Sequence, residues 1–182
     1  METYYPSGSL NESFYLNKDE KRQGPYTAYY ENGVIKEESI YDSGILNGIR
    51  KLYFESGALE IEETYDKKGN QNGPYTVYFP SGVVQLEKTY HQNMIKGEIK
   101  VYYPSGKIKE EVSMDNNQEN GPFTEFYENG TIHWKGEYLN GDNEFGLLEE
   151  FDSTGVLIKK MMCDSIAICR TIWKPGMDSV VN

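Results

Sequence analysis

The chain has 182 residues, a formal net charge of −11 at pH 7 and 16 tyrosines. Nucleic acid phosphates and anionic lipids repel a chain this acidic, which argues against both as direct partners and favours a basic protein partner. Residues 1–20 lack the pattern of a secretory signal, and no apolar run reaches the ~18 residues of a membrane span. We therefore expect a cytoplasmic protein that does not bind membranes.

Glycines recur along the chain with a period of 24 or 25 residues. One series consists of Gly24, Gly48, Gly73, Gly97, Gly121 and Gly146. A second series lies nine residues further on and consists of Gly33, Gly57, Gly82, Gly106, Gly130 and Gly155, with Gly8 as an earlier member. A period of this length is typical of repeat proteins, in which each unit buries its apolar face against its neighbours.

The first complete unit, residues 24–41, predicts a β-hairpin. Apolar and polar residues alternate over residues 26–30, which is the period-2 pattern of a strand. Glu31-Asn32-Gly33 then predicts a turn, because glycine suits the left-handed residue that closes a short hairpin. Residues 35–41 predict the returning strand. The predicted fold is all-β, an elongated repeat sheet of consecutive antiparallel β-hairpins forming a solenoid, with about six to seven units and terminal caps.

The repeat divides the chain into three segments. Residues 1–23 form an N-terminal partial repeat or cap, residues 24–163 form the hairpin repeats, and residues 164–182 form a non-repeat C-terminal tail. The apolar stretch Ile166–Trp173 of the tail either covers the open end of the sheet or contacts a partner. Gly-Pro openings occur in alternate units, a double period of 48 or 49 residues that indicates either duplication of a two-hairpin block or an alternating binding surface.

Cys163 and Cys169 are six residues apart near the end of the chain. If one straight strand held both, they would lie ~20 Å apart at ~3.3 Å per residue, too far for a disulfide. We therefore expect two reduced cysteines.

Aromatic residues stand four positions before the turn glycines and form the first candidate surface. They should share the face opposite most of the aliphatic residues. These aromatics either stabilise the sheet through cross-strand pairs or form a groove for a partner, since tyrosine is enriched in binding hot spots. The partner-binding candidates of this set are Tyr29, Tyr53, Tyr78 and Tyr102.

Acidic residues five positions past the turn glycines form the second candidate surface. They are Glu38, Glu62, Glu87 and Glu111, followed in later units by Lys135 and Lys160. We interpret the glutamates either as a solvated face or as a strip that docks a basic partner, because like charges in line are not favoured by stability alone. Glu37, Glu63 and Glu110 are expected to widen the strip.

No residue pattern indicates catalysis. His91 and His133 belong to no spacing typical of a metal site or a catalytic triad, and no phosphate-binding loop is present. We expect no catalytic residue, no metal site and no cofactor, and hence a protein that is not an enzyme.

The strings YYENGVIKEESIY, YFESGALEIEETY and YFPSGVVQLEKTY, each preceded by a connecting glycine, carry a family resemblance. They resemble the variant MORN repeat of bacterial proteins of the YwqK antitoxin type, over roughly residues 4–160. The resemblance implies a single-layer or gently curved sheet of hairpins and an antitoxin or immunity protein encoded beside a secreted toxin. Eukaryotic MORN repeats are richer in glycine and tryptophan, so their suggested phospholipid binding is not carried over.

Two functions from different classes follow from these observations. In the first, the chain is a bacterial antitoxin or immunity protein that neutralises a toxin by binding its basic domain through the acidic and aromatic face. In the second, it is a general MORN-repeat scaffold or membrane-associated assembly protein without a toxin partner. Neither hypothesis fixes an oligomeric state.

Overall fold

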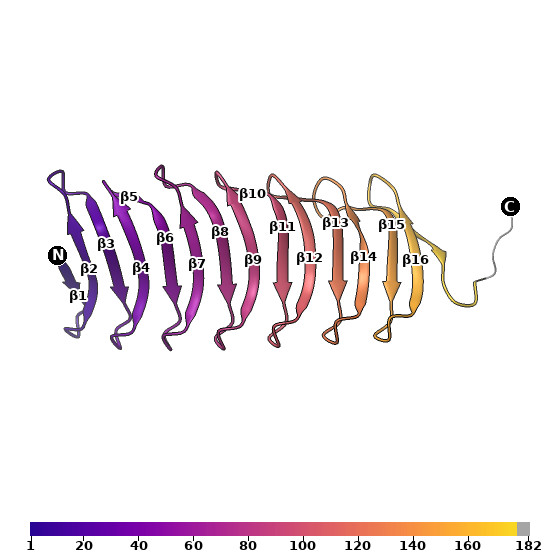
Figure 1. The fold of residues 1–182 in the computed structure, drawn as a ribbon, viewed down its shortest axis with the longest axis horizontal. Coiled ribbons are helices and arrows are strands. Elements are labelled where there is room, and N and C mark those ends of the chain that lie inside the picture. Colours follow the sequence, from indigo (N-terminus) through magenta and orange to yellow (C-terminus); the bar gives the residue numbers. More distant parts are fainter. Residues whose placement is uncertain (178–182) are drawn as a thin grey trace. The chain divides into compact units, whose positions relative to one another are not determined.

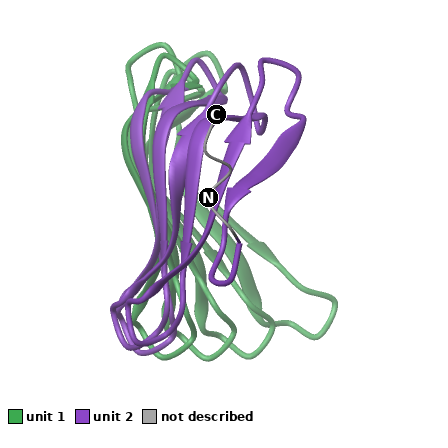
Figure 2. Ribbon diagram, turned by 90° about the vertical axis from the view of Figure 1, so that its right-hand side faces the viewer, with its two compact units in different colours: residues 1–94 green, residues 95–182 purple. Residues whose placement is uncertain are grey.

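The computed structural model describes residues 1–177, which contain 17 β-strands and no helix. This part of the chain therefore has no helical segment that could span a membrane. The chain divides into two compact units, residues 1–94 and residues 95–182, which Figure 2 shows in different colours. The short strand β10 (Met94–Ile95) lies at the boundary. Residues 178–182 of the expected tail lie outside the described residues.

In each unit the strands follow one another in chain order (Figure 1), and the strand pairings within each unit are antiparallel. Unit 1 contains β1 (Glu2–Tyr4), β2 (Leu10–Leu16), β3 (Arg22–Tyr29), β4 (Ile35–Asp42), β5 (Ile45–Leu46), β6 (Gly48–Tyr53), β7 (Leu59–Tyr65), β8 (Gln71–Tyr78) and β9 (Val84–His91). Unit 2 contains β11 (Gly97–Tyr102), β12 (Ile108–Asp115), β13 (Gln118–Phe126), β14 (Ile132–Tyr138), β15 (Glu144–Phe151), β16 (Leu157–Cys163) and β17 (Cys169–Trp173). The prediction of an all-β protein built from consecutive antiparallel hairpins is confirmed.

The hairpin turns share one geometry. In the turn of β3 and β4, the Gly33 N–H donates to the Tyr30 carbonyl at 2.9 Å, and the Tyr30 N–H donates to the Val34 carbonyl at 2.8 Å. Gly33 has a φ of 85°, a left-handed conformation that a β-carbon disfavours. The register shifts by one residue at Ala28/Tyr29, which marks a bulge beside the turn. The same hydrogen bond and positive φ occur at Gly8, Gly57, Gly82, Gly106, Gly130 and Gly155.

The turn after Cys163 follows the geometry of earlier connectors. Oδ1 of Asp66 accepts hydrogen bonds from the N–H groups two and four residues later, at 2.8 and 3.0 Å. Oδ1 of Asp164 does the same at 3.1 and 3.0 Å. Ala167 has a φ of 58° where the earlier connector has Gly69 at 81°. Residues 164–173, placed by the sequence in a non-repeat tail, therefore form a connector and a strand like those of the repeats.

The expectation of reduced cysteines is wrong, because no straight strand holds both. The connector at Asp164 reverses the chain, and β17 pairs with β16 so that Cys169 lies directly opposite Cys163. Their Cα atoms are 3.9 Å apart and their sulfur atoms form a disulfide. The sequence separation of six residues is thus spanned by a turn and not by ~20 Å of extended chain.

One face of the unit 1 sheet is buried more than the other, and we call it the packed face. Its most buried side chains are Tyr26, Ala28, Ser39 and Glu63. We call the opposite face the open face, since side chains alternate between faces along a strand. The central cross-strand pairs of the packed face are polar or aromatic: Tyr26 with Ser39, Arg50 with Glu63, and Tyr75 with Lys88.

The packed face of unit 2, by contrast, contains an apolar cluster. Val112, Phe123, Leu148 and Cys163 form its buried cluster, with Trp134, Tyr138 and Met161 among the residues packed against it. Phe123 lies opposite Gly136 across β13 and β14. A β-carbon at Gly136 would lie 2.9 Å from Cγ of Leu148 and 3.0 Å from Cε1 of Phe123. The glycine therefore makes room for the two largest buried side chains of this cluster.

Candidate functional site

The predicted glutamates of unit 1 lie on the open face, on the second strand of each hairpin. Glu38 lies opposite Thr27 within its hairpin and opposite Lys51 on β6. Glu62 lies opposite Lys51 and Thr76, and Nζ of Lys51 is 3.3 Å from Oε2 of Glu62. The interpretation of the glutamates as neighbouring like charges therefore needs correction, because lysine or threonine stands between them.

Unit 2 continues this alternation of charge on its own open face. Nζ of Lys100 lies 3.3 Å from Oε1 of Glu111, directly across β11 and β12. Glu149 lies between Lys135 and Lys160, and each ammonium is 2.8 Å from one of its carboxylate oxygens. Hydrogen bonds from Lys135 and then Lys160 lower the pKa of Glu149. Cross-strand ion pairs of this kind stabilise a sheet, so these alternating lysines and glutamates have a structural role.

Glu37, Glu63 and Glu110 do not widen the strip, because they lie on the packed faces. Arg50 binds Glu37 through two hydrogen bonds of 3.0 Å and Glu63 through one of 3.1 Å. The Tyr65 hydroxyl also donates to Glu63 at 3.0 Å. Each of these three acids immediately precedes or follows a glutamate of the open face, so strand alternation turns it to the other side.

A groove on the open face of unit 1 brings one predicted residue together with exposed apolar side chains. It has a volume of about 310 Å³ and crosses β3, β4 and β6. Ile40 and Ile49 in its lining are 50% and 49% exposed. Its lining residues are Pro25, Tyr26, Thr27, Glu38, Ser39, Ile40, Ile49 and Lys51. Two half-exposed isoleucines beside a carboxylate are a surface that a protein partner could cover.

Unit 2 has a groove at the corresponding repeat positions. It has a volume of about 350 Å³ and crosses β13, β14 and β15. Its lining residues are Pro122, Phe123, Thr124, Lys135, Gly136, Glu137, Leu147 and Glu149. Lys135 replaces Glu38 and Glu149 replaces Lys51, so the charges are reversed between the two grooves. Glu137 replaces Ile40, which leaves this second groove less apolar than the first.

Five segments of the chain match the model of the MORN repeat variant family, at residues 22–43, 46–67, 71–92, 96–116 and 119–140. Together they span more than half of the 182 residues. The chain belongs to the MORN repeat variant family. No curated protein matches the chain. Each matched MORN segment contains one complete hairpin, from β3–β4 to β13–β14, while β1–β2 and β15–β16 repeat the same turn outside the matched segments.

The predicted tyrosines end the first strand of four MORN hairpins and are half-buried. The Tyr53 hydroxyl donates a hydrogen bond to Oε2 of Glu38, so the structure brings together one member of each predicted set. Burial, and then the hydrogen bond to Glu38, raise the pKa of Tyr53 to about 12. Tyr29, Tyr78 and Tyr102 occupy the same position on β3, β8 and β11.

A second set of tyrosines, one residue further on, links consecutive MORN repeats. The Tyr30 hydroxyl donates to the Tyr53 carbonyl at 2.7 Å, and the Tyr103 hydroxyl donates to the Phe126 carbonyl at 2.7 Å. The Tyr5 hydroxyl makes the same bond to the Tyr29 carbonyl. Sequence reasoning missed this role. The recurrence of a hydroxyl-bearing aromatic at a fixed repeat position was the available signal.

Aromatic pairs on the packed faces follow the double period of the MORN repeats. Tyr26 and Tyr41 lie with ring centroids 5.7 Å apart, and Tyr75 and Tyr90 lie 5.8 Å apart. Phe123 and Tyr138 form the equivalent pair in unit 2, at 4.3 Å. All three pairs belong to hairpins that open with Gly-Pro, so alternate repeats share this aromatic pair on their packed face.

Glu110 and Glu125 lie directly opposite each other on the packed face of unit 2. Burial and then the charges of Glu125 and Glu119 raise the pKa of Glu110 above its ordinary 4.5. The folded state therefore binds the proton of Glu110 more tightly than the unfolded chain does. The contribution of this carboxyl to the free energy of unfolding falls as pH rises through the window above 4.5. We expect Glu110→Gln to raise the free energy of unfolding at pH 7 and to have less benefit at pH 4.

Urea unfolding of Glu110→Gln and the parent chain between pH 4 and pH 8 measures this difference. Glu111→Gln is the matched control, since its carboxylate faces Lys100 on the open face and its removal should give no gain at pH 7. A Glu110→Gln variant less stable than the parent at pH 7 would contradict the expected repulsion.

Proposed function

We propose that this chain is a non-catalytic protein-binding protein of the antitoxin or immunity class. It acts in the cytoplasm and neutralises a toxin by covering its basic domain with the open face of unit 1. The observation that carries the proposal is the unit 1 groove, in which Ile40 and Ile49 stand half-exposed beside Glu38. Membership of the MORN repeat variant family supports a binding role, because a sheet of repeated hairpins offers an extended surface.

Apolar contact supplies the affinity in this proposal. Burying an exposed aliphatic side chain contributes about 1.5–3 kcal/mol, and roughly half of that remains available at each isoleucine of the groove. Pro25 on the neighbouring strand extends the apolar surface. A hydrophobic centre with a charged rim is the usual anatomy of a protein interface.

Charge selects the partner. The net charge of −11 accelerates the approach of a basic protein and disfavours an acidic one. Within the groove, Glu38 already accepts the hydrogen bond of Tyr53, and a carboxylate has further acceptor sites for an arginine or lysine of the partner. Lys51 is held by Glu62 at 3.3 Å, which limits its repulsion of a basic group.

The test uses the tagged chain, expressed in its native host, to capture its partner. The captured protein is then expressed alone and together with the chain in cells. We expect growth arrest by the partner alone and rescue by the chain. A captured protein that does not impair growth would contradict the antitoxin class and favour the scaffold alternative.

A pair of variants locates the binding surface. Ile40→Ser with Ile49→Ser should abolish rescue, because both side chains line the groove. Ile166→Ser with Ile168→Ser is the matched control, since these isoleucines are also exposed but lie in the turn after β16. Rescue that survives the groove variant and fails in the control would assign binding to the C-terminal turn and overturn the assignment of the groove.

A further inference from the structure

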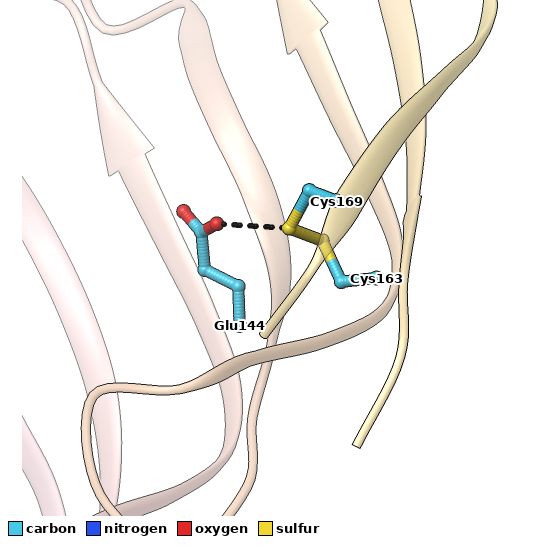
Figure 3. Close-up of side chains that lie close together, drawn as sticks. All are labelled: Glu144, Cys163 and Cys169. Carbon is cyan, nitrogen blue, oxygen red and sulfur yellow. Dashed lines mark hydrogen bonds between the residues drawn. A yellow bond between two sulfur atoms is a disulfide. The ribbon is translucent and has the colours of Figure 1, made fainter. Parts of the chain in front are cut away.

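Three strands of unit 2 bring two cysteines and a carboxylate together at one edge of the sheet (Figure 3). Glu144 begins β15, Cys163 ends β16 and Cys169 begins β17. The two sulfur atoms and a carboxylate oxygen all lie within 4.8 Å of one another. Within residues 1–177 this is the one group of three or more such side chains close enough to share a metal ion.

The surroundings hold the group in place from one side and leave it accessible from the other. Cys163 is buried against the apolar cluster of Val112, Phe123 and Leu148. Glu144 and Cys169 are half-buried, and the turn that begins at Asp164 is exposed. Packing therefore holds Cys163 in position, while an ion and a water molecule can reach the sulfur atoms from solvent.

The carboxylate is placed against sulfur in a way that the disulfide itself does not explain. Oε2 of Glu144 lies 3.3 Å from Sγ of Cys169, which Figure 3 marks with a dashed line. A disulfide sulfur carries no proton to donate to this oxygen. After reduction, a thiol could donate to it, and two thiolates and a carboxylate could share a cation.

We propose that the reduced chain binds one Zn²⁺ through the thiolates of Cys163 and Cys169 and the carboxylate of Glu144, with water as the fourth ligand. Tetrahedral zinc takes thiolate ligands at about 2.3 Å and carboxylate ligands at about 2.0 Å, which puts sulfur and oxygen about 3.5 Å apart. The present separation of 3.3 Å already fits this geometry. The main change required is separation of the two sulfur atoms to about 3.8 Å.

Metal binding and the disulfide exclude each other. A dithiol or phosphine reductant supplies two electrons, two protons are taken up, and the S–S bond becomes two thiols. Binding of Zn²⁺ then releases these two protons as the thiolates form. Oxidation by a disulfide oxidant removes two electrons, re-forms the S–S bond and releases the ion. The inference does not depend on the proposed function, because its three ligands belong to unit 2 and the groove belongs to unit 1.

The experiment measures metal binding by the full chain in its two oxidation states. The chain is reduced with a phosphine under anaerobic conditions and titrated with Zn²⁺ against a chromophoric chelator, and with Co²⁺ to detect thiolate-to-metal charge-transfer absorption. We expect one equivalent bound by the reduced chain and none by the oxidised chain. Equal binding by both forms, or no binding by the reduced form, would overturn the proposal.

Two variants test the ligands. Glu144→Gln should weaken Zn²⁺ binding at least tenfold, whereas Glu137→Gln, an exposed acid on β14, should leave it unchanged. Affinity that is the same in Glu144→Gln and the parent would remove Glu144 from the site. Cys163→Ser with Cys169→Ser should abolish the Co²⁺ absorption. Because Cys163 is buried and this variant could fail to fold, Cys169→Ser alone, which leaves the buried cysteine in place, provides the second measurement and should also lose the Co²⁺ absorption.

Discussion

Arg50→Ala should destabilise unit 1 by about 3 kcal/mol, the lower end of the cost of breaking a buried ion pair. Arg50 holds Glu37 and Glu63 together on the packed face, and Glu63 is only 5% exposed. Without the guanidinium, two carboxylates would share a partly buried site with only the hydrogen bonds of Tyr65, Gln71 and Ser39 to satisfy them. Urea unfolding at pH 7 measures the loss.

Lys51→Ala is the control for Arg50→Ala. The two residues are adjacent on β6 and each pairs with a glutamate, but Lys51 and Glu62 lie on the open face. An exposed pair of this kind contributes less than about 1 kcal/mol. Equal losses from the two substitutions would contradict the assignment of Arg50 to a buried network.

Leu148→Ala should destabilise unit 2 by about 2–5 kcal/mol, the range for a large-to-small change in a core. Leu148 is fully buried, at 0% exposure, and packs within the cluster of Val112 and Phe123. Leu147→Ala on the open face is the control. Because Leu147 is 43% exposed, this substitution should lower the free energy of unfolding much less. Thermal or urea unfolding measures the stability of both variants. Equal losses of stability would contradict the assignment of Leu148 to the packed face of unit 2.

The contact between Leu148 and Gly136 gives a sharper form of this prediction. Gly136→Ala alone should cost about 1–3 kcal/mol, because its β-carbon would lie 2.9 Å from Cγ of Leu148. In the double variant, Leu148→Ala removes the nearer of the two obstructing side chains and leaves Phe123 at 3.0 Å. The combined loss should therefore be smaller than the sum of the two single losses. Additive losses would show that the two residues do not meet.

The hairpins were predictable from the sequence because their determinants are local. Each turn needs a left-handed residue at a fixed position, and the glycine series marks these positions, as at Gly33. The placement of Glu38 on the open face followed from strand alternation alone. The same rule, applied to Glu37, would have placed that residue on the packed face.

The cysteine pair was not predicted because its connector carries no glycine. Ala167 takes the left-handed conformation that Gly69 has in an earlier connector, so no glycine marks the position of this turn in the sequence. Asn17, Asp66 and Asp164 lie at intervals of 49 and 98 residues and accept the same backbone hydrogen bonds. That spacing was the signal for a turn after Cys163.

The polar network of Arg50 could not be predicted from residue types. Arginine and glutamate are usually solvent-exposed, and only the register of β6 against β7 puts Arg50 opposite Glu63 on the buried side. The charge alternation on the open face has the same origin. Strand pairing inserts Lys51 between Glu38 and Glu62, which are well separated in sequence from each other.

Isoleucine methyl NMR distinguishes a partner docked on the open face of unit 1 from one docked elsewhere on the chain. The chain, at 20.9 kDa, is labelled at its isoleucine methyl groups and titrated with the captured partner. Docking on the open face should shift or broaden the signals of Ile40 and Ile49 first, while that of Ile166, which is 72% exposed, stays unchanged. Perturbation of Ile166 with unchanged signals for Ile40 and Ile49 would contradict it.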